Sequence, residues 1–256
     1  MNTMTFSIIT ITFQAEAVLQ RTLDSVLAQT YPHIEHLIVD GASKDGTLAM
    51  AKNYQQLSDA QHNGHTVIVQ SEPDKGIYDA MNKGLAKATG DYVVFLNAGD
   101  WLPAEDTLQQ VAEKAADRPA VIYGDTAIYD GEGHYLHPRR LRPPKNLSWR
   151  SFRHGMLVCH QAFYARLDIA KDIHYDTQYK YSGDVDWCIR VMKAAAQQKL
   201  PLRNVEAVIV NYTEEGATTR HHRESLRERY QVMCHHYGRI TTLLMHLWFV
   251  VRTFIR

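Results

Sequence analysis

The segment that most constrains this chain is residues 71–100, SEPDKGIYDAMNKGLAKATGDYVVFLNAGD. Its apolar residues recur at spacings of three and four over residues 77–88, which predicts a helix. A continuous apolar run at residues 92–96 then predicts a buried strand. This strand leads directly into residues 97–100, NAGD, which end in a carboxylate. A carboxylate at the carboxyl end of a buried strand lies where open α/β sheets bind their ligands.

Asp100 is a candidate ligand for a divalent cation. Carboxylate oxygens suit Mg²⁺ or Mn²⁺, and such an ion can hold a diphosphate. Asn, Gly and Asp also favour ordinary turns, so the spacing alone leaves a metal site and a simple turn equally open.

Alternating strands and helices are predicted throughout the first half. Apolar, β-branched runs at residues 6–13 (FSIITITF), 36–40 (HLIVD) and 67–70 predict strands, and amphipathic segments between them predict helices. Three such units within about 90 residues imply right-handed crossovers and a parallel sheet covered on both faces.

Residues 71–100 resemble the middle of family 2 glycosyltransferases, which are inverting enzymes of the GT-A fold. They are similar to the bacterial colanic-acid-type polysaccharide transferases, which carry EPDxGIYDAMNKG and LNxGD. The resemblance implies one Rossmann-like, mostly parallel sheet flanked by helices. In many relatives the strand ends in D-x-D, so Asp100 corresponds to the metal-binding Asp, while Asn97 and Gly99 stand where those relatives carry Asp. One carboxylate makes a weaker metal site than two.

The resemblance also implies residues that bind the nucleotide. Phe13, next to Thr12, corresponds to an aromatic that stacks on uracil, and Asp40 to a carboxylate that accepts a hydrogen bond from the base or ribose. A planar base offers a π face to an aromatic ring and N–H donors to a carboxylate. A core role for Phe13 and a turn role for Asp40 are the alternatives.

A polar group follows at the start of the predicted helix. Asp74, Lys75, Asp79 and Asn82, together with Asn97, complete the predicted donor site. Asp79 and Asn82 share a helix face near the helix N-terminus, where a diphosphate can be approached. A solvated helix face is equally open.

Residues 181–187, YSGDVDW, open another predicted helix and match the family's E-D-x-D/E motif. By that match Asp184 is the catalytic base, with Gly183 in place of the Glu and Asp186 as the second candidate. Inverting transfer is a single displacement, so one carboxylate must take the proton of the acceptor hydroxyl. The alternative is that both carboxylates only favour the helix N-terminus.

Three more segments of the second half are candidates for the acceptor side or the phosphates. Residues 159–163, CHQAF, are similar to the family's H-Q-x-x-F segment, which places His160 near the acceptor; Asp186 and Trp187 are assigned to the same side. The basic, proline-rich residues 137–145 either cover the site or form a surface loop. Arg220, His221 or His222 could reach the phosphates from the loop at residues 214–220, or this loop is simply exposed.

Composition fits one catalytic domain with an extension. We expect a domain over residues 1–220, with a nucleotide-binding half (1–100) and an acceptor half (101–220), followed by an amphipathic helical extension (221–256). Lys+Arg and Asp+Glu balance at 28 each, which gives no reason to expect nucleic acid as a partner. The three cysteines are scattered and form no metal or disulfide pattern. The chain enters its first strand without a signal-peptide pattern, so a cytoplasmic setting is expected.

Residues 240–256, ITTLLMHLWFVVRTFIR, are apolar but too short for a spanning helix, which needs about 20 apolar residues. Flanking arginines and Trp248 suit a helix on an anionic membrane surface, with packing on the domain or on a second subunit as the alternative.

We therefore expect a metal-dependent inverting glycosyltransferase that uses a nucleotide-sugar, most simply a UDP-sugar, with Mn²⁺ or Mg²⁺. Its acceptor would be a saccharide or lipid-linked saccharide at the inner face of the cell membrane, in bacterial surface polysaccharide synthesis. Two alternatives remain: a non-catalytic relative of the fold, and a nucleotidyltransferase. The second would need a glycine-rich, basic loop after the first strand, and residues 10–14 lack both features.

Overall fold

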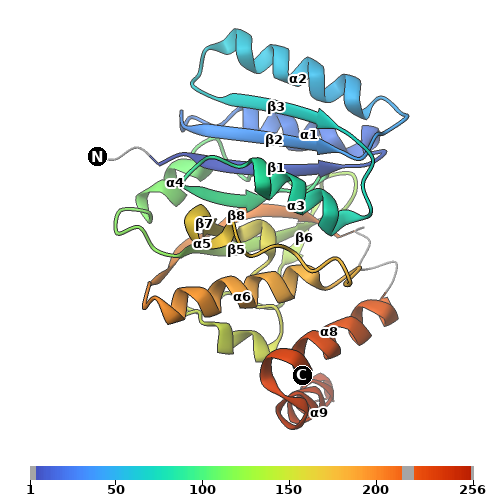
Figure 1. Cartoon of the computed structure of the whole chain (residues 1–256), viewed down its shortest axis with the longest axis vertical. Helices are drawn as coiled ribbons and strands as arrows, with labels where there is room; N and C mark the ends of the chain where they lie inside the picture. Colours follow the sequence, from blue (N-terminus) through green and yellow to red (C-terminus); the bar gives the residue numbers. More distant parts are fainter. Residues whose placement is uncertain (1–3, 215–221, 255–256) are drawn as a thin grey trace.

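The structure is a computed structural model that describes residues 4–214 and 222–254. One eight-stranded sheet runs through the molecule in the order β3-β2-β1-β4-β7-β5-β6, and β8 pairs with β5 beside this path (Figure 1). The strands are β1 (Phe6–Thr12), β2 (Ile34–Asp40), β3 (Thr66–Ser71), β4 (Tyr92–Phe95), β5 (Val121–Tyr129), β6 (Tyr135–Pro138), β7 (Phe163–Arg166) and β8 (Leu202–Thr213).

Helices cover both faces of this sheet, with α3 and α6 in front of it and α1 behind it in the view of Figure 1. The helices are α1 (Glu16–Leu27), α2 (Thr47–Gln61), α3 (Ile77–Lys87), α4 (Thr107–Glu113), α5 (Leu167–Ala170), α6 (Gly183–Gln197), α8 (His222–Tyr237) and α9 (Arg239–Phe254), with short 3₁₀ turns η1 (Trp149–His154) and η2 (His160–Ala162). The predicted α/β class with a flanked, mostly parallel sheet is confirmed.

The first four strands are all parallel, as their crossover connections require. In their register Thr12 pairs with Asp40, and Asp40 pairs with Ser71. The carboxyl ends of β1, β2 and β3 therefore meet at one edge of the sheet. This register brings residues far apart in the sequence to a common place.

The second half of the sheet is mixed. β7 lies between β4 and β5 and is antiparallel to both, and β6 is an antiparallel edge strand. The basic segment predicted as a loop begins inside β6, because an edge strand tolerates Pro138. β8 runs parallel to β5 over almost its whole length.

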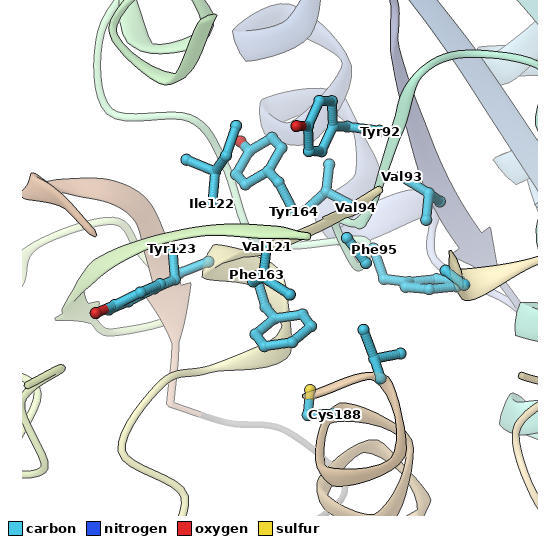
Figure 2. Close-up of a cluster of buried hydrophobic side chains, with 14 of the residues drawn as sticks. Tyr92, Val93, Val94, Phe95, Val121, Ile122, Tyr123, Phe163, Tyr164 and Cys188 are labelled. Carbon is cyan, nitrogen blue, oxygen red and sulfur yellow. The ribbon is translucent and has the colours of Figure 1, made fainter. Parts of the chain in front are cut away.

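The core lies where β4, β5 and β7 meet α6. Figure 2 shows side chains from all four elements packed together in this region. The labelled residues are Tyr92, Val93, Val94, Phe95, Val121, Ile122, Tyr123, Phe163, Tyr164 and Cys188, and all are buried. Fully burying an apolar side chain of this size contributes roughly 1.5–3 kcal/mol, so this cluster fixes α6 firmly against the sheet.

Close packing also fixes α3. Gly84 lies so near β1 that an added Cβ would be 2.5 Å from Cγ2 of Ile9. The helix can therefore approach the sheet only with glycine at this position. This contact sets the place of the α3 N-terminus beside the strand ends.

The last two helices leave an apolar stripe uncovered. α8 packs against α6, and α9 packs against α8 and η1. Side chains at spacings of three and four along α9 remain exposed, namely Ile240, Leu243, Leu244, Leu247, Trp248 and Val251. Within the described ranges, every helix is too short or too polar to traverse a bilayer.

Candidate active site

A cavity of about 1010 Å³ opens at the carboxyl ends of the parallel strands. Residues of β1, α3 and α6 line it, together with the loop after β4. Its charged and aromatic lining residues are Phe13, Asp74, Tyr78, Asp100, Arg139, His160, Lys180, Tyr181, Asp184, Tyr212 and Arg229. The register of the sheet thus gathers most of the predicted site in one place.

Phe13 and Thr12 line the cavity as predicted. The Phe13 ring is 66% exposed, which rules out a core role for it. Gly41 and Asp74 lie next to it, since a Cβ on Gly41 would be 3.2 Å from the Phe13 ring and 2.9 Å from Asp74 Oδ2. An exposed aromatic ring at a cavity wall suits a planar ligand.

Asp40 lies beneath this wall. Its carboxylate accepts hydrogen bonds from Thr12 Oγ1 (3.1 Å), the Ser43 amide (3.0 Å), Ser43 Oγ (2.5 Å) and Ser71 Oγ (2.6 Å). The residue has no exposed surface and does not line the cavity. In this structure Asp40 holds neighbouring strand ends and their loop together, and its contact with a base stays a prediction.

Lys83 of α3 shapes the loop before that helix. Its Nζ lies 2.6 Å from Asp74 Oδ1, 3.3 Å from Glu72 and 3.6 Å from Asp79. This ion-pair cluster turns one side of the Asp74 carboxylate to the helix while the residue lines the cavity. Asp79 and Lys83 are four residues apart on α3, a spacing that brings side chains together on one helix face.

Three predicted donor residues lie away from the cavity wall. Asp79 accepts a hydrogen bond from the Lys75 amide (2.9 Å), and Asn82 exchanges two with the backbone of Tyr175 (2.7 and 2.9 Å). These side chains are occupied in holding α3 and the loop at Tyr175. Lys75, Asp79 and Asn82 are not among the residues that line the cavity, and their contact with the donor stays a prediction.

Asp100 is buried at the end of the loop after β4, and 4% of it is exposed. Its Oδ2 accepts from Gln161 Nε2 (2.8 Å) and its Oδ1 from the Thr213 amide (2.9 Å). Burial raises the pKa of Asp100 to about 6, and these two hydrogen bonds oppose the rise. The carboxylate is thus fixed in place before any ligand binds.

The backbone of this loop explains why Gly99 replaces an Asp. Gly99 has φ +98, in the region that favours glycine, and its amide donates to Thr22 Oγ1 at 2.9 Å. Thr22 Oγ1 in turn donates to the Asp100 carbonyl at 2.7 Å. The reduced acidic motif therefore belongs to a tight turn held by α1.

A chain of polar contacts crosses the cavity from Asn97 to Asp184. Asn97 Nδ2 lies 3.3 Å from His160 Nε2, and His160 Nδ1 lies 3.2 Å from Asp184 Oδ2. When Asn97 donates to Nε2, the neutral ring donates through Nδ1 to Asp184. His160 thus links the loop after β4 to the start of α6.

Tyr78 of α3 completes the surroundings of Asp184. Its hydroxyl lies 3.5 Å from Asp184 Oδ1 and accepts a hydrogen bond from the Gly183 amide at 2.9 Å. Burial raises the pKa of a carboxyl, but the hydrogen bond from His160 and the positive charge of Arg229 outweigh it, so the pKa of Asp184 lies below its ordinary value. Asp184 is therefore ionised at neutral pH while it lines the cavity.

Asp186 and Trp187 do not line the cavity. Asp186 is buried between Arg190 (2.7 Å) and His236 (2.7 Å), on the side of α6 that meets α8. The Trp187 ring has no exposed surface and stacks on Tyr175 with ring centroids 5.0 Å apart. Both side chains are buried because α6 is buried almost all round at its start, and their role on the acceptor side stays a prediction.

Sequence reasoning missed several residues of the site. Tyr78 and Gln161 stood in matched segments without a role, and nothing local marks Thr213 or Arg229, which the fold brings in from separate elements. The candidates Arg220 and His221 lie outside the described residues, as does the side chain of His222.

Asp100 is the carboxylate that the cavity offers at the predicted metal position. The described part of the chain holds no group of three or more His, Cys, Asp or Glu that could bind a metal. Mg²⁺ is commonly held by one or two carboxylates with substrate phosphates and water, and a carboxylate can accept more than the two hydrogen bonds that Asp100 receives. The donor set fits an ion that takes its remaining ligands from a diphosphate.

The comparisons with known proteins agree with this geometry. Residues 7–173 match the model of the family described as Glycosyl transferase family 2. The chain belongs to this family. It is a glycosyltransferase with a GT-A fold.

Two curated relatives are glycosyltransferases by name. The PGL/p-HBAD biosynthesis glycosyltransferase of Mycobacterium bovis (strain BCG / Pasteur 1173P2) is 33% identical over 217 residues, which cover 82% of this chain and 77% of that protein. The putative teichuronic acid biosynthesis glycosyltransferase TuaG of Bacillus subtilis (strain 168) is 35% identical over 113 residues, 44% of this chain and 42% of that protein.

Solved structures share the fold at low sequence identity. S. aureus TarS 1-349 in complex with UDP-GlcNAc aligns with a TM-score of 0.70 at 18% identity, over 94% of this chain and 70% of that chain. The mannosyltransferase PcManGT from Pyrobaculum calidifontis, in complex with GDP-Man and Mn²⁺, aligns with a TM-score of 0.59 at 17% identity, over 94% and 73%.

Asp100→Asn should raise the free energy of unfolding of this protein at pH 7.5 when no metal is bound. The folded-state pKa of Asp100 is raised, so its ionisation opposes folding as pH rises through about 6. With about 1.36 kcal/mol per pKa unit, the gain reaches up to about 3 kcal/mol and shrinks as pH falls toward 4. Urea unfolding of the parent and the variant at pH 7.5 and pH 4 measures this gain. Asp172→Asn is the control, because Asp172 is exposed. An equal difference at the two pH values would contradict the prediction.

Proposed function

We propose that this glycosyltransferase moves a sugar from a UDP-sugar to a hydroxyl of a saccharide or lipid-linked saccharide, with inversion at the anomeric carbon. One observation carries the proposal: the half-buried Asp184 lines the same cavity as Phe13 and Asp100, and its pKa is held below the ordinary value. A base, a platform for a planar group and a fixed carboxylate are thus in one site. That set suits single displacement from a nucleotide-sugar.

The donor would place its base against Phe13, next to Thr12. The ring is exposed in the absence of a ligand, and stacking on a base contributes roughly 1–3 kcal/mol in proteins that bind single-stranded nucleic acid. The choice of uracil draws support from TarS, whose structures are described as complexes with UDP-GlcNAc and with UDP.

Asp184 would take the proton. The acceptor oxygen attacks C1 of the sugar from the face opposite the nucleotide, and its proton passes to the carboxylate. The bond between C1 and the phosphate oxygen breaks, and its electron pair leaves with the nucleoside diphosphate. Tyr78 and His160 orient Asp184 for this step through their contacts with its two oxygens.

Asp100 would hold Mn²⁺ or Mg²⁺, which as a Lewis acid would offset charge on the departing diphosphate. The structure of PcManGT in complex with GDP-Man and Mn²⁺ supports this cofactor class. Gln161 and Thr213 keep the carboxylate in place for the ion.

The proposed pathway is a bacterial surface glycan, with the enzyme on the inner face of the membrane. The names of two relatives, which refer to PGL/p-HBAD and to teichuronic acid biosynthesis, support a glycan of this kind. The exposed stripe on α9 supports contact with the membrane surface, because apolar side chains and Trp248 are together on one uncovered face.

Asp184→Asn should abolish transfer while leaving UDP binding intact. The amide keeps the shape but cannot accept the proton, and loss of a positioned base lowers turnover about 10²–10⁴-fold. Titration calorimetry with UDP in Mn²⁺ and release of UDP from UDP-sugars measure the two properties, with Asp172→Asn as control. Unchanged turnover in Asp184→Asn would contradict the assignment of Asp184 as the base. A parent protein that binds no UDP would instead favour the non-catalytic alternative.

Leu247→Glu should weaken binding to anionic vesicles about tenfold or more, because it puts a charge in the stripe that contacts the acyl region. Sedimentation with phosphatidylcholine vesicles, with and without phosphatidylglycerol, measures this. Leu57→Glu on α2 is the matched control, since Leu57 is similarly exposed. Equal sedimentation of both variants would argue against the membrane, and a dimer lost only in Leu247→Glu would assign the stripe to a second subunit.

A further inference from the structure

Helix α8 places a positively charged side chain in the cavity wall, and this helix lies outside the region that matches the family model. That match ends at residue 173, whereas Arg229 lies in α8 and lines the cavity. The Nε atom of Arg229 is buried and has no hydrogen-bond partner within the described ranges. A buried charged donor without an acceptor is unfavourable unless a ligand supplies one.

The residue before it fixes the position of α8. The Glu228 carboxylate accepts hydrogen bonds from the amides of Lys180 (2.9 Å), Tyr181 (2.7 Å) and Ser182 (3.1 Å). These three residues lead into α6, and Ser182 Oγ also donates to the Ser225 carbonyl at 3.2 Å. The clamp joins α8 to the helix that carries Asp184, so Arg229 is held at a set place in the wall.

Arg229 is near Asp184 but not paired with it. Its charge helps to lower the pKa of Asp184, yet none of the ion pairs within 4.0 Å that the described residues form joins the two. The other cations of the cavity wall differ from it: Arg139 donates to the Leu141 carbonyl, and Lys180 is exposed. Arg229 therefore combines permanent charge, partial burial and a free donor.

We propose that Arg229 binds the diphosphate of the nucleotide donor and of the nucleoside diphosphate product. This rests on the proposed function. A guanidinium presents its N–H groups in a planar fork that matches phosphate oxygens, which neutral sugar hydroxyls do not require. Because Asp100 is the one carboxylate placed for a metal, a fixed cation supplied by α8 adds positive charge where the departing diphosphate gains its negative charge.

The test compares UDP with uridine in EDTA, so that a metal does not mask the contribution of Arg229. Titration calorimetry measures the binding of UDP, and saturation-transfer NMR measures the binding of uridine. Arg229→Gln should weaken UDP binding about 10- to 100-fold and leave uridine binding unchanged, because only the contact with the phosphates is lost. The UDP affinity of Arg229→Lys should lie between those of the parent and Arg229→Gln, because lysine keeps the charge but lacks the planar fork of N–H donors.

Arg227→Gln is the matched control, because Arg227 is an exposed cation on the same helix. It should bind both ligands as the parent does. Unchanged UDP affinity in Arg229→Gln would overturn the assignment, and so would an equal loss for UDP and uridine. A parent protein that binds neither ligand, in EDTA and in Mn²⁺ alike, would refute the proposed function, and this inference with it.

Discussion

The hydrogen bond between His160 and Asp184 is the contact on which the rest of the site depends. Burial by itself would raise the pKa of Asp184 and favour the protonated carboxyl, which cannot act as a base. His160 reverses this effect, and Asn97 holds His160 from the opposite side. The proposed base is thus kept charged by residues from the loop after β4, from η2 and from α8, so the sheet and its helices must be assembled before Asp184 has this environment.

The sheet supplies this assembly through its order and its packing. β7 is inserted antiparallel between β4 and β5, and η2, which carries His160, immediately precedes it. The aromatic core beneath fixes α6, and Gly84 lets α3 approach closely enough for Tyr78 to reach Asp184. The cavity wall is completed by α8, which lies beyond the part of the chain that the family model matches. Stability and function are therefore coupled at α6, which the core packs on one side and the cavity borders on the other.

The sequence predicted what depends on local pattern. Apolar runs and turn residues located β1 to β4, and the matched segments located Phe13, Asp100, His160 and Asp184 at the cavity. Contacts between distant segments could not be found this way, and the Glu228 clamp on residues 180–182 is one example, since no local period reports it. Trp187 could not be placed from the sequence because nearly every side of α6 is buried at its start, so its apolar pattern does not say which side meets the cavity.

The pH dependence of kcat tests the central claim most directly, measured at saturating UDP-sugar and Mn²⁺ in the parent enzyme and in His160→Ala. Without the hydrogen bond from His160, burial should dominate and raise the pKa of Asp184, so kcat should begin to fall at a higher pH than in the parent. His160→Asn, whose amide can still donate, should restore part of the shift. Identical acid limbs in all three proteins would contradict the account, because Asp184 would then be neither the base nor dependent on His160.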